Sequence, residues 1–183
     1  MRKTAFLHVP KCAGTSVRDA CIDALQPRHV IRDVFDPRIF GSEDVIANLP
    51  EPTRRQLITE RPGDAADLDF VSGHIFLSTL TMYFPDLDHF TILREPRCHL
   101  LSRWLFWRQN FRHRDMGSDE WGRRAQASTA SFAGFLTAEN ISCATDNLIT
   151  RMLVSPSALI RDDRFIQPEN DNAILRIAAR NLR

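Results

Sequence analysis

Short apolar segments alternate with stretches of helical periodicity in the first part of the chain. Residues 4–9 form an apolar run, and apolar side chains then recur at helical spacing as far as Leu25. A second unit of this kind is predicted from a strand at 89–93 and a helix at 97–111, and residues 70–75 form a further apolar strand. Strands separated by helices predict an α/β fold, with a parallel sheet flanked by helices and ligands at the carboxyl ends of the strands.

The rest of the chain has weaker patterns. Residues 116–131 are polar and small, which predicts a mobile connection that covers a substrate cleft. Further helices are expected in the segments 43–49, 52–60, 131–139, 145–153 and 168–182.

The bulk composition is that of a globular protein. Its 183 residues are enough for a single domain, 1–183, and 43% of them are hydrophobic. The 24 basic residues against 23 acidic ones give a net charge of +1, which excludes a general polyanion binder and predicts no nucleic-acid partner. Any anion site has to be local, and only Lys3 and Lys11 are lysines.

Cysteine spacing and hydropathy limit the cofactors and the location. The four cysteines form no CxxC pair and no cluster with histidine, so neither a metal site nor a disulfide framework is predicted. No apolar run approaches the roughly 20 residues that cross a bilayer, and the first residues lack the pattern of a signal peptide. We therefore expect a cytoplasmic protein without a membrane span or a metal.

The segment between the first strand and the first helix has the composition of an anion site. It consists of Lys11, Cys12, Ala13, Gly14, Thr15 and Ser16. At the start of a helix it offers backbone N–H groups, two hydroxyls and an ammonium to a phosphate or a sulfate. Its order differs from a Walker A loop, in which glycine precedes the lysine. The structural alternative is that Thr15 or Ser16 caps the helix and that Lys11 is a solvated cation.

A second candidate phosphate site follows the strand at 89–93. Arg94 stands at the strand end before a Glu-Pro pair, and Ser102 lies eight residues further on. Arginine can hold a phosphate through two parallel hydrogen bonds, and a serine hydroxyl adds a small donor. The structural alternatives are a salt bridge for Arg94 and a helix-surface hydroxyl for Ser102.

Together these motifs resemble those of the PAPS-dependent sulfotransferases, in particular the carbohydrate branch that includes the heparan sulfate 2-O-sulfotransferases. That branch reads Pro-Lys, two variable residues and Gly-Thr-Ser, as residues 10–16 do here, and later has an arginine with a serine eight residues beyond it. The resemblance implies a P-loop-like fold and PAPS (3′-phosphoadenosine 5′-phosphosulfate) as co-substrate. It also implies that Lys11 and residues 13–16 hold the 5′-phosphosulfate, while Arg94 and Ser102 hold the 3′-phosphate.

A general base for an acceptor hydroxyl is expected near the end of the strand at 70–75. His74 follows Gly73 there, and the resemblance implies a Gly-His pair in this part of the chain, with histidine or a carboxylate as base. An imidazole can take a proton near neutral pH. The structural alternative for His74 is a hydrogen-bonded core residue. The competing candidates for the base are Glu95, His99 and His113.

Two features concern the C-terminal half. Residues 146–151 resemble another stretch of the carbohydrate sulfotransferases, and by themselves they predict a helix capped by Asp146. In that family a strand and a helix usually follow the segment that corresponds to 168–182, whereas this chain stops at Arg183. The C-terminal part is therefore short by comparison.

The expected function is transfer of a sulfuryl group from PAPS to a hydroxyl of an acceptor, with a glycan or glycolipid favoured by the resemblance. No metal is expected, because a sulfuryl group carries less charge than a phosphoryl group. One alternative is a P-loop kinase of nucleotides or of adenylyl sulfate, which the lysine order and the lack of a carboxylate at a predicted strand end disfavour. The other is a truncated relative that binds nucleotide without catalysis.

Overall fold

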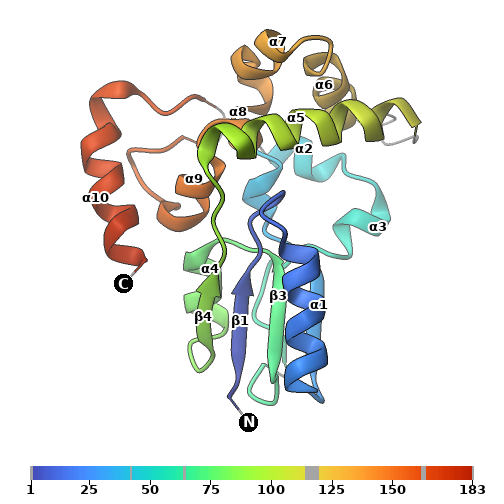
Figure 1. Cartoon of the computed structure of the whole chain (residues 1–183), viewed down its shortest axis with the longest axis vertical. Coiled ribbons are helices and arrows are strands. Elements are labelled where there is room, and N and C mark those ends of the chain that lie inside the picture. Colours follow the sequence, from blue (N-terminus) through green and yellow to red (C-terminus); the bar gives the residue numbers. More distant parts are fainter. Residues whose placement is uncertain (1, 42, 64, 114–119, 162–163, 183) are drawn as a thin grey trace.

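A parallel sheet forms the centre of the protein. The computed structural model describes residues 2–41, 43–63, 65–113, 120–161 and 164–182. The sheet has four strands in the order β2-β3-β1-β4, and these are β1 (Thr4–Leu7), β2 (Val30–Phe35), β3 (Phe70–His74) and β4 (Asp88–Thr91). All pairings are parallel, and helices flank the sheet, so the predicted α/β fold is confirmed at this level (Figure 1).

The strands end at a common edge of the sheet. Leu7 at the end of β1 pairs with Gly73 of β3 and with Thr91 of β4, so the loops that follow these strands leave the sheet side by side. The inner strands β1 and β3 are almost wholly buried, as expected for a sheet that is covered on both faces. Helix α5 (Pro96–His113) runs across this edge, and the edge and α5 together frame the candidate site (Figure 1).

The other elements cover the sheet and α5. Helix α1 (Gly14–Leu25) follows β1, and α4 (Leu77–Tyr83) follows β3. The remaining α-helices are α2 (Glu43–Ala47), α3 (Glu51–Arg54), α6 (Glu120–Ser128), α7 (Phe132–Thr137), α8 (Ser142–Thr145), α9 (Leu148–Val154) and α10 (Asp171–Asn181). Short 3-10 helices cover Pro37–Ile39, Glu139–Ile141 and Pro168–Asn170. Within the described residues, no helix has the length and apolar character needed to cross a membrane.

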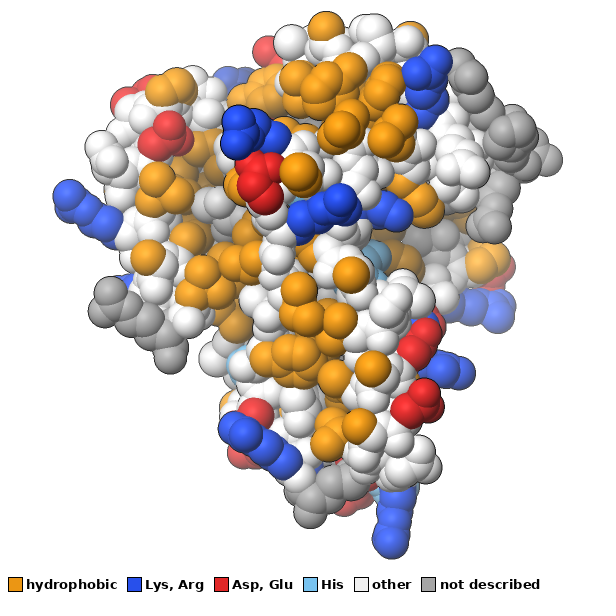
Figure 2. Space-filling model, in the orientation of Figure 1, with side chains coloured by type: hydrophobic (Ala, Val, Ile, Leu, Met, Phe, Trp, Pro, Cys, Tyr) orange, Lys and Arg blue, Asp and Glu red, His pale blue; other side chains and the backbone are white. Residues whose placement is uncertain are grey.

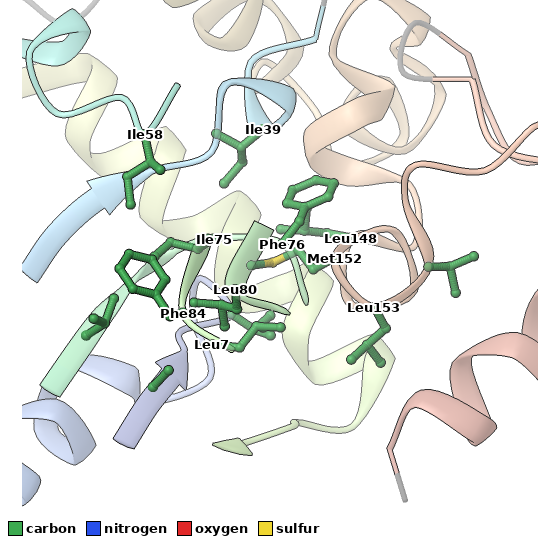
Figure 3. Packing of buried hydrophobic residues seen from close by; sticks show 14 of the residues in the cluster. Leu7, Ile39, Ile58, Ile75, Phe76, Leu80, Phe84, Leu148, Met152 and Leu153 are labelled. Atoms are coloured by element: carbon green, nitrogen blue, oxygen red, sulfur yellow. The ribbon is translucent and has the colours of Figure 1, made fainter. Parts of the chain in front are cut away.

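Two apolar clusters hold these layers together. The larger one joins the sheet to α4 and α9 and includes Leu7, Leu80 and Met152, each at most 2% exposed (Figure 3). The smaller one joins α5 to α6, α7 and α8 and includes Trp107 and Phe135. Because buried side chains interdigitate closely, the second cluster fixes α5 against the helices that follow it in the chain.

Three predicted strands are confirmed: β1 corresponds to 4–9, β3 to 70–75 and β4 to 89–93. The predicted helix that reaches Leu25 corresponds to α1, and the one at 97–111 corresponds to α5. Strand β2 was missed by the sequence pattern. Its centre carries the charged pair Arg32-Asp33, its pairing with β3 shifts register between Ile31 and Val34, and Asp33 has a φ of 59°. This irregular, half-exposed strand lacks the alternation by which strands are identified.

Three predicted segments are wrong in detail. Residues 120–128 form α6 and not a mobile connection, and residues 116–119 of that predicted connection lie outside the described part. The helix predicted at 52–60 ends at Arg54, because the chain then bridges from Leu57 to Phe35 at the edge of the sheet. The helix predicted at 145–153 corresponds to α9, but it begins only after Asn147, whose φ is 47°, and Thr145 is the last residue of the separate helix α8.

Candidate functional site

The loop between β1 and α1 has two residues in the left-handed region. Lys11 has a φ of 66° and Ala13 a φ of 61°. For residues with a Cβ this conformation costs roughly 1–2 kcal/mol each. Such strain persists where the surrounding structure imposes it, and it is concentrated at ligand-binding sites.

The N-terminus of α1 is open. Ala13 is the N-cap residue, no side chain among the described residues caps the helix, and its first turn has no acidic residue. The interpretation of Thr15 or Ser16 as a helix cap is therefore wrong. In an α-helix the first amide N–H groups lack intrahelical partners, so the N–H groups of this turn are available to an anion. The exposed hydroxyls of Thr15 and Ser16 lie in the same turn.

Lys11 is half-buried and surrounded by aromatic and positive groups. Its Nζ lies 4.0 Å from the ring centroid of Phe106 on α5. Burial, together with the charges of Arg94 and Arg103, lowers the pKa of Lys11. A desolvated ammonium next to two other cations is stabilised by an anion more than by water.

Arg94 joins the two sequence motifs in space. Its Nη1 donates a hydrogen bond to the carbonyl oxygen of Lys11 at 3.3 Å, and its side chain is exposed at the start of α5. The neighbouring Glu95 accepts a hydrogen bond from the N–H of Cys98 at 2.8 Å, which lowers the pKa of Glu95 to about 2. Glu95 thus orders the turn that presents Arg94, and its carboxylate is engaged by Arg97 and by the N–H of Cys98. Ser102 is half-buried on α5, and no hydrogen bond joins it to the loop among the described residues.

A cavity of about 580 Å³ opens between this loop, the ends of β2 and β3, and α5. Its polar lining includes Lys11, Ser16, His74 and Arg103. Its apolar walls include Phe35, Ile39, Phe40, Phe106 and Trp107. Figure 2 shows Lys and Arg side chains gathered between hydrophobic areas near the junction of the sheet and α5. Neither Arg94 nor Ser102 lines this cavity.

His74 lies in this cavity at the end of β3. Its Nδ1 is 2.7 Å from the carbonyl oxygen of His8, and since a carbonyl only accepts, Nδ1 carries the proton and Nε2 is the basic nitrogen. Burial and the neighbouring His8 lower the pKa of His74 to about 3, so the ring is neutral at physiological pH. The N–H of Asp36 donates to the carbonyl oxygen of His74 at 2.9 Å and fixes its backbone. His74 is thus a side chain of the cavity and is also hydrogen-bonded within the fold.

His8 and Gly14 explain the shape of the loop. The His8 ring lies 4.5 Å from that of His74 and stacks on Phe6 at 5.6 Å between centroids. A Cβ on Gly14 would lie 1.8 Å from Cδ2 of His8. Only glycine lets the first turn of α1 approach this imidazole. Burial lowers the pKa of His8 to about 4, so this ring is neutral too.

The other histidine candidates have different surroundings. His99 on α5 donates from Nε2 to the carbonyl oxygen of Pro10 at 2.7 Å, and burial lowers its pKa. This hydrogen bond fixes the loop to α5 and does not direct His99 into the cavity, whose lining excludes it. The side chain of His113 lies outside the described part of the chain.

Arg103 is a charged side chain of the cavity that the sequence analysis missed. It is 4% exposed, and its Nε and Nη1 have no hydrogen-bond partner among the described residues. Burial lowers its pKa to about 10, so the guanidinium remains charged. The sequence contained one indication that Arg103 is buried, namely its spacing. His99, Arg103 and Trp107 recur every four residues and lie on the buried face of α5.

Two acidic residues that directly follow a strand or a helix have structural roles. Asp36, directly after β2, accepts from Arg38 Nη2 at 2.7 Å and from Thr79 Oγ1 at 2.6 Å. Burial raises its pKa, but the hydrogen bonds from Arg38 outweigh this and hold the pKa below its usual value. Asp146 forms a salt bridge of 2.9 Å with the buried Arg151 and accepts from the N–H of Ile166 at 2.7 Å. Asp146 therefore ties two segments together and does not cap α9, which corrects the prediction.

Comparisons with known proteins add no family assignment. No protein-family model, no curated protein and no solved structure matches this chain. Its function is therefore proposed from the site and the motifs.

Proposed function

We propose that the protein is a PAPS-dependent sulfotransferase whose β1, loop and α1 form a P-loop-like phosphosulfate site. The observation that carries the proposal is the contact between Arg94 and the backbone of Lys11. Two motifs that each suit a phosphate, 83 positions apart in the sequence, meet at the carboxyl edge of a parallel sheet. A nucleotide with phosphate groups on its 5′ and 3′ sides needs two such anion sites close together, and this edge is where α/β sheets bind ligands.

The open end of α1 supports a role for the loop at the 5′ end of the nucleotide. Its backbone N–H groups, the Thr15 and Ser16 hydroxyls and the Lys11 ammonium would hold the phosphosulfate through charge-assisted hydrogen bonds. Arg94, together with Ser102, would hold the 3′-phosphate outside the cavity.

The proposed reaction is an in-line displacement at sulfur. The acceptor hydroxyl oxygen forms a bond to sulfur while the bond from sulfur to the bridging oxygen of the 5′-phosphate breaks, and the nucleotide leaves with that electron pair. Nε2 of His74 takes the hydroxyl proton, since the neutral ring has its lone pair there. Lys11 stabilises the charge that develops on the leaving oxygen, and positioning supplies most of the remaining rate gain. A glycan or glycolipid hydroxyl is the acceptor class that we propose.

The kinase alternative needs carboxylates free to hold Mg²⁺ next to the phosphates. The carboxylate of Asp36 lies directly after β2, whereas the sequence predicted no carboxylate at a strand end. Its oxygens are engaged by Arg38 and Thr79, so it is committed to the fold and does not favour the kinase.

Calorimetric titration tests the proposal directly. Adenosine 3′,5′-bisphosphate should bind the protein more tightly than 5′-AMP, and without Mg²⁺. Tighter binding of ATP in the presence of Mg²⁺ would favour the kinase instead. Turnover with PAPS and a panel of hydroxyl acceptors then separates an enzyme from a relative that only binds nucleotide.

A further inference from the structure

Arg103 is a buried cation that the proposed transfer step does not use. Its side chain is 4% exposed, and Nε and Nη1 remain without a hydrogen-bond partner in the described part of the chain. Folded proteins pair nearly all buried polar groups, because an unpaired buried charge is strongly unfavourable. A guanidinium in this state is expected to have a ligand.

Among the described residues, the groups around Arg103 do not supply a counter-charge. The ring of Trp107 lies 5.0 Å from its Cζ and contributes a cation–π attraction. The neighbouring Cys12 thiol stays neutral, because burial raises its pKa. Lys11 adds positive charge, and no salt bridge among the described residues involves Lys11, Arg94 or Arg103.

The position of Arg103 indicates which ligand it meets. Arg103 lines the cavity together with His74, whereas Arg94 lies outside it. If Arg94 holds the 3′-phosphate outside the cavity while Lys11 and residues 13–16, which line it, hold the phosphosulfate, the remaining space beside His74 is left to the acceptor. The walls of this space are largely apolar, with Phe35, Phe40 and Trp107 among them. An occupant that fits both features combines an apolar body with an anionic group.

We propose that Arg103 binds a carboxylate, sulfate or phosphate group of the acceptor, and that the acceptor, within the glycan or glycolipid class, is therefore an organic anion that also carries an apolar body. This assignment to the acceptor rests on the proposed sulfotransferase function, whereas the presence of an anion site at Arg103 does not. An oxyanion could also come from the nucleotide itself, so the two sources have to be measured separately.

The test compares two ligands and two variants of the full chain by calorimetry. The ligands are 3-phenylpropionate and its neutral analogue 3-phenylpropanamide, which differ mainly in charge. The variants are Arg103→Met, in which an unbranched apolar side chain replaces the one that carries the guanidinium, and Arg108→Met. Arg108 is a matched control, because it lies on the same helix with its Cζ 5.1 Å from the ring of Trp104 but does not line the cavity.

We expect the wild type and Arg108→Met to prefer the acid over the amide by about 10- to 100-fold, as for a charge-assisted contact. Arg103→Met should lose this preference while its affinity for adenosine 3′,5′-bisphosphate is unchanged. No preference for the acid in the wild type, or the same preference in Arg103→Met, overturns the proposal. A loss of nucleotide affinity in Arg103→Met alone assigns the anion to the nucleotide and overturns the acceptor assignment. Acid preference that depends on Arg103 in a protein that does not bind the nucleotide refutes the proposed function and retains the anion site.

Discussion

The guanidinium of Arg94 donates a hydrogen bond to the carbonyl oxygen of Lys11 at 3.3 Å. This contact places a side chain from the end of β4 against the left-handed turn that follows β1. Lys11 in turn covers the ring of Phe106 on the helix that begins just after Arg94. The two motifs are therefore parts of one positively charged site, and each can be tested through its own substitution.

Replacing Arg94 tests the 3′-phosphate assignment. Arg94→Ala should weaken binding of adenosine 3′,5′-bisphosphate by roughly 10- to 150-fold, since a charge-assisted hydrogen bond contributes about 1.5–3 kcal/mol. Binding of 5′-AMP, which lacks that phosphate, should be unchanged. Arg97→Ala is the control, because this side chain is 93% exposed and pairs with Glu95. Equal losses for the two nucleotides in Arg94→Ala would contradict the assignment.

Replacing Lys11 tests its role in the transfer step. Lys11→Ala should lower the single-turnover rate by about 10²–10³, because the contact strengthens as charge develops on the leaving oxygen. Affinity for the product nucleotide should change much less. Lys3→Ala is the control, since Lys3 donates to the carbonyl oxygen of Ala66 at 2.7 Å, near the other end of β1. Near-normal turnover of Lys11→Ala would remove Lys11 from the mechanism.

His74→Asn separates catalysis from folding. Asparagine can keep a donor to the carbonyl oxygen of His8 but has no basic nitrogen in place of Nε2. Transfer should fall by about 10²–10⁴ while nucleotide affinity and melting temperature stay close to the wild type. A variant that melts earlier but still transfers sulfate at the normal rate would show that His74 is structural.

Acid should destabilise the fold through His8 and His74. Their pKa values of about 4 and about 3 lie below the usual 6.5, so the unfolded chain binds more protons between these values. The stability that the neutral rings contribute is fully present above pH 6.5 and is lost as the pH falls toward 4. Urea midpoints measured from pH 7.5 to 4 should show this decline, and His74→Asn should flatten it. The same dependence of the urea midpoint on pH in His74→Asn as in the wild type would refute this cause. His29→Asn is the control, because His29 is exposed.

Gly14→Ala should destabilise the protein by about 1–3 kcal/mol, the usual cost of overpacking. The new Cβ would overlap the His8 ring, which is held between Phe6 and His74 and cannot move freely. Gly63→Ala is a matched control, because a Cβ there meets nothing within 4 Å. Thermal melting of both variants is sufficient, and equal melting temperatures would show that the loop yields without cost.

Much of the fold followed from local patterns in the sequence. Apolar runs and helical spacing predicted β1, β3, β4, α1 and α5, because period and turn residues act over a few positions. Strand β2 escaped because its irregular pairing and charged centre depend on the neighbour β3. The break between α8 and α9 escaped for a similar reason, since the carboxylate of Asp146 accepts from the Arg151 side chain and from the distant N–H of Ile166, and does not cap the first turn of α9.

The sequence by itself determined which residues could bind an anion, and it identified Lys11, the loop after it, and Arg94 through their order and spacing. Only the tertiary structure decided that Arg94 meets the backbone of Lys11 while Ser102 does not line the cavity. Only the structure showed the open end of α1, the tautomer of His74 and the guanidinium of Arg103, whose Nε and Nη1 have no partner in the described part of the chain. The reason is physical: residue type fixes what a group can donate or accept, whereas burial and partners are set by segments distant in the chain. The sequence does not distinguish Arg103 among the chain's 22 arginines, because only packing against Trp107 in the folded protein removes it from water.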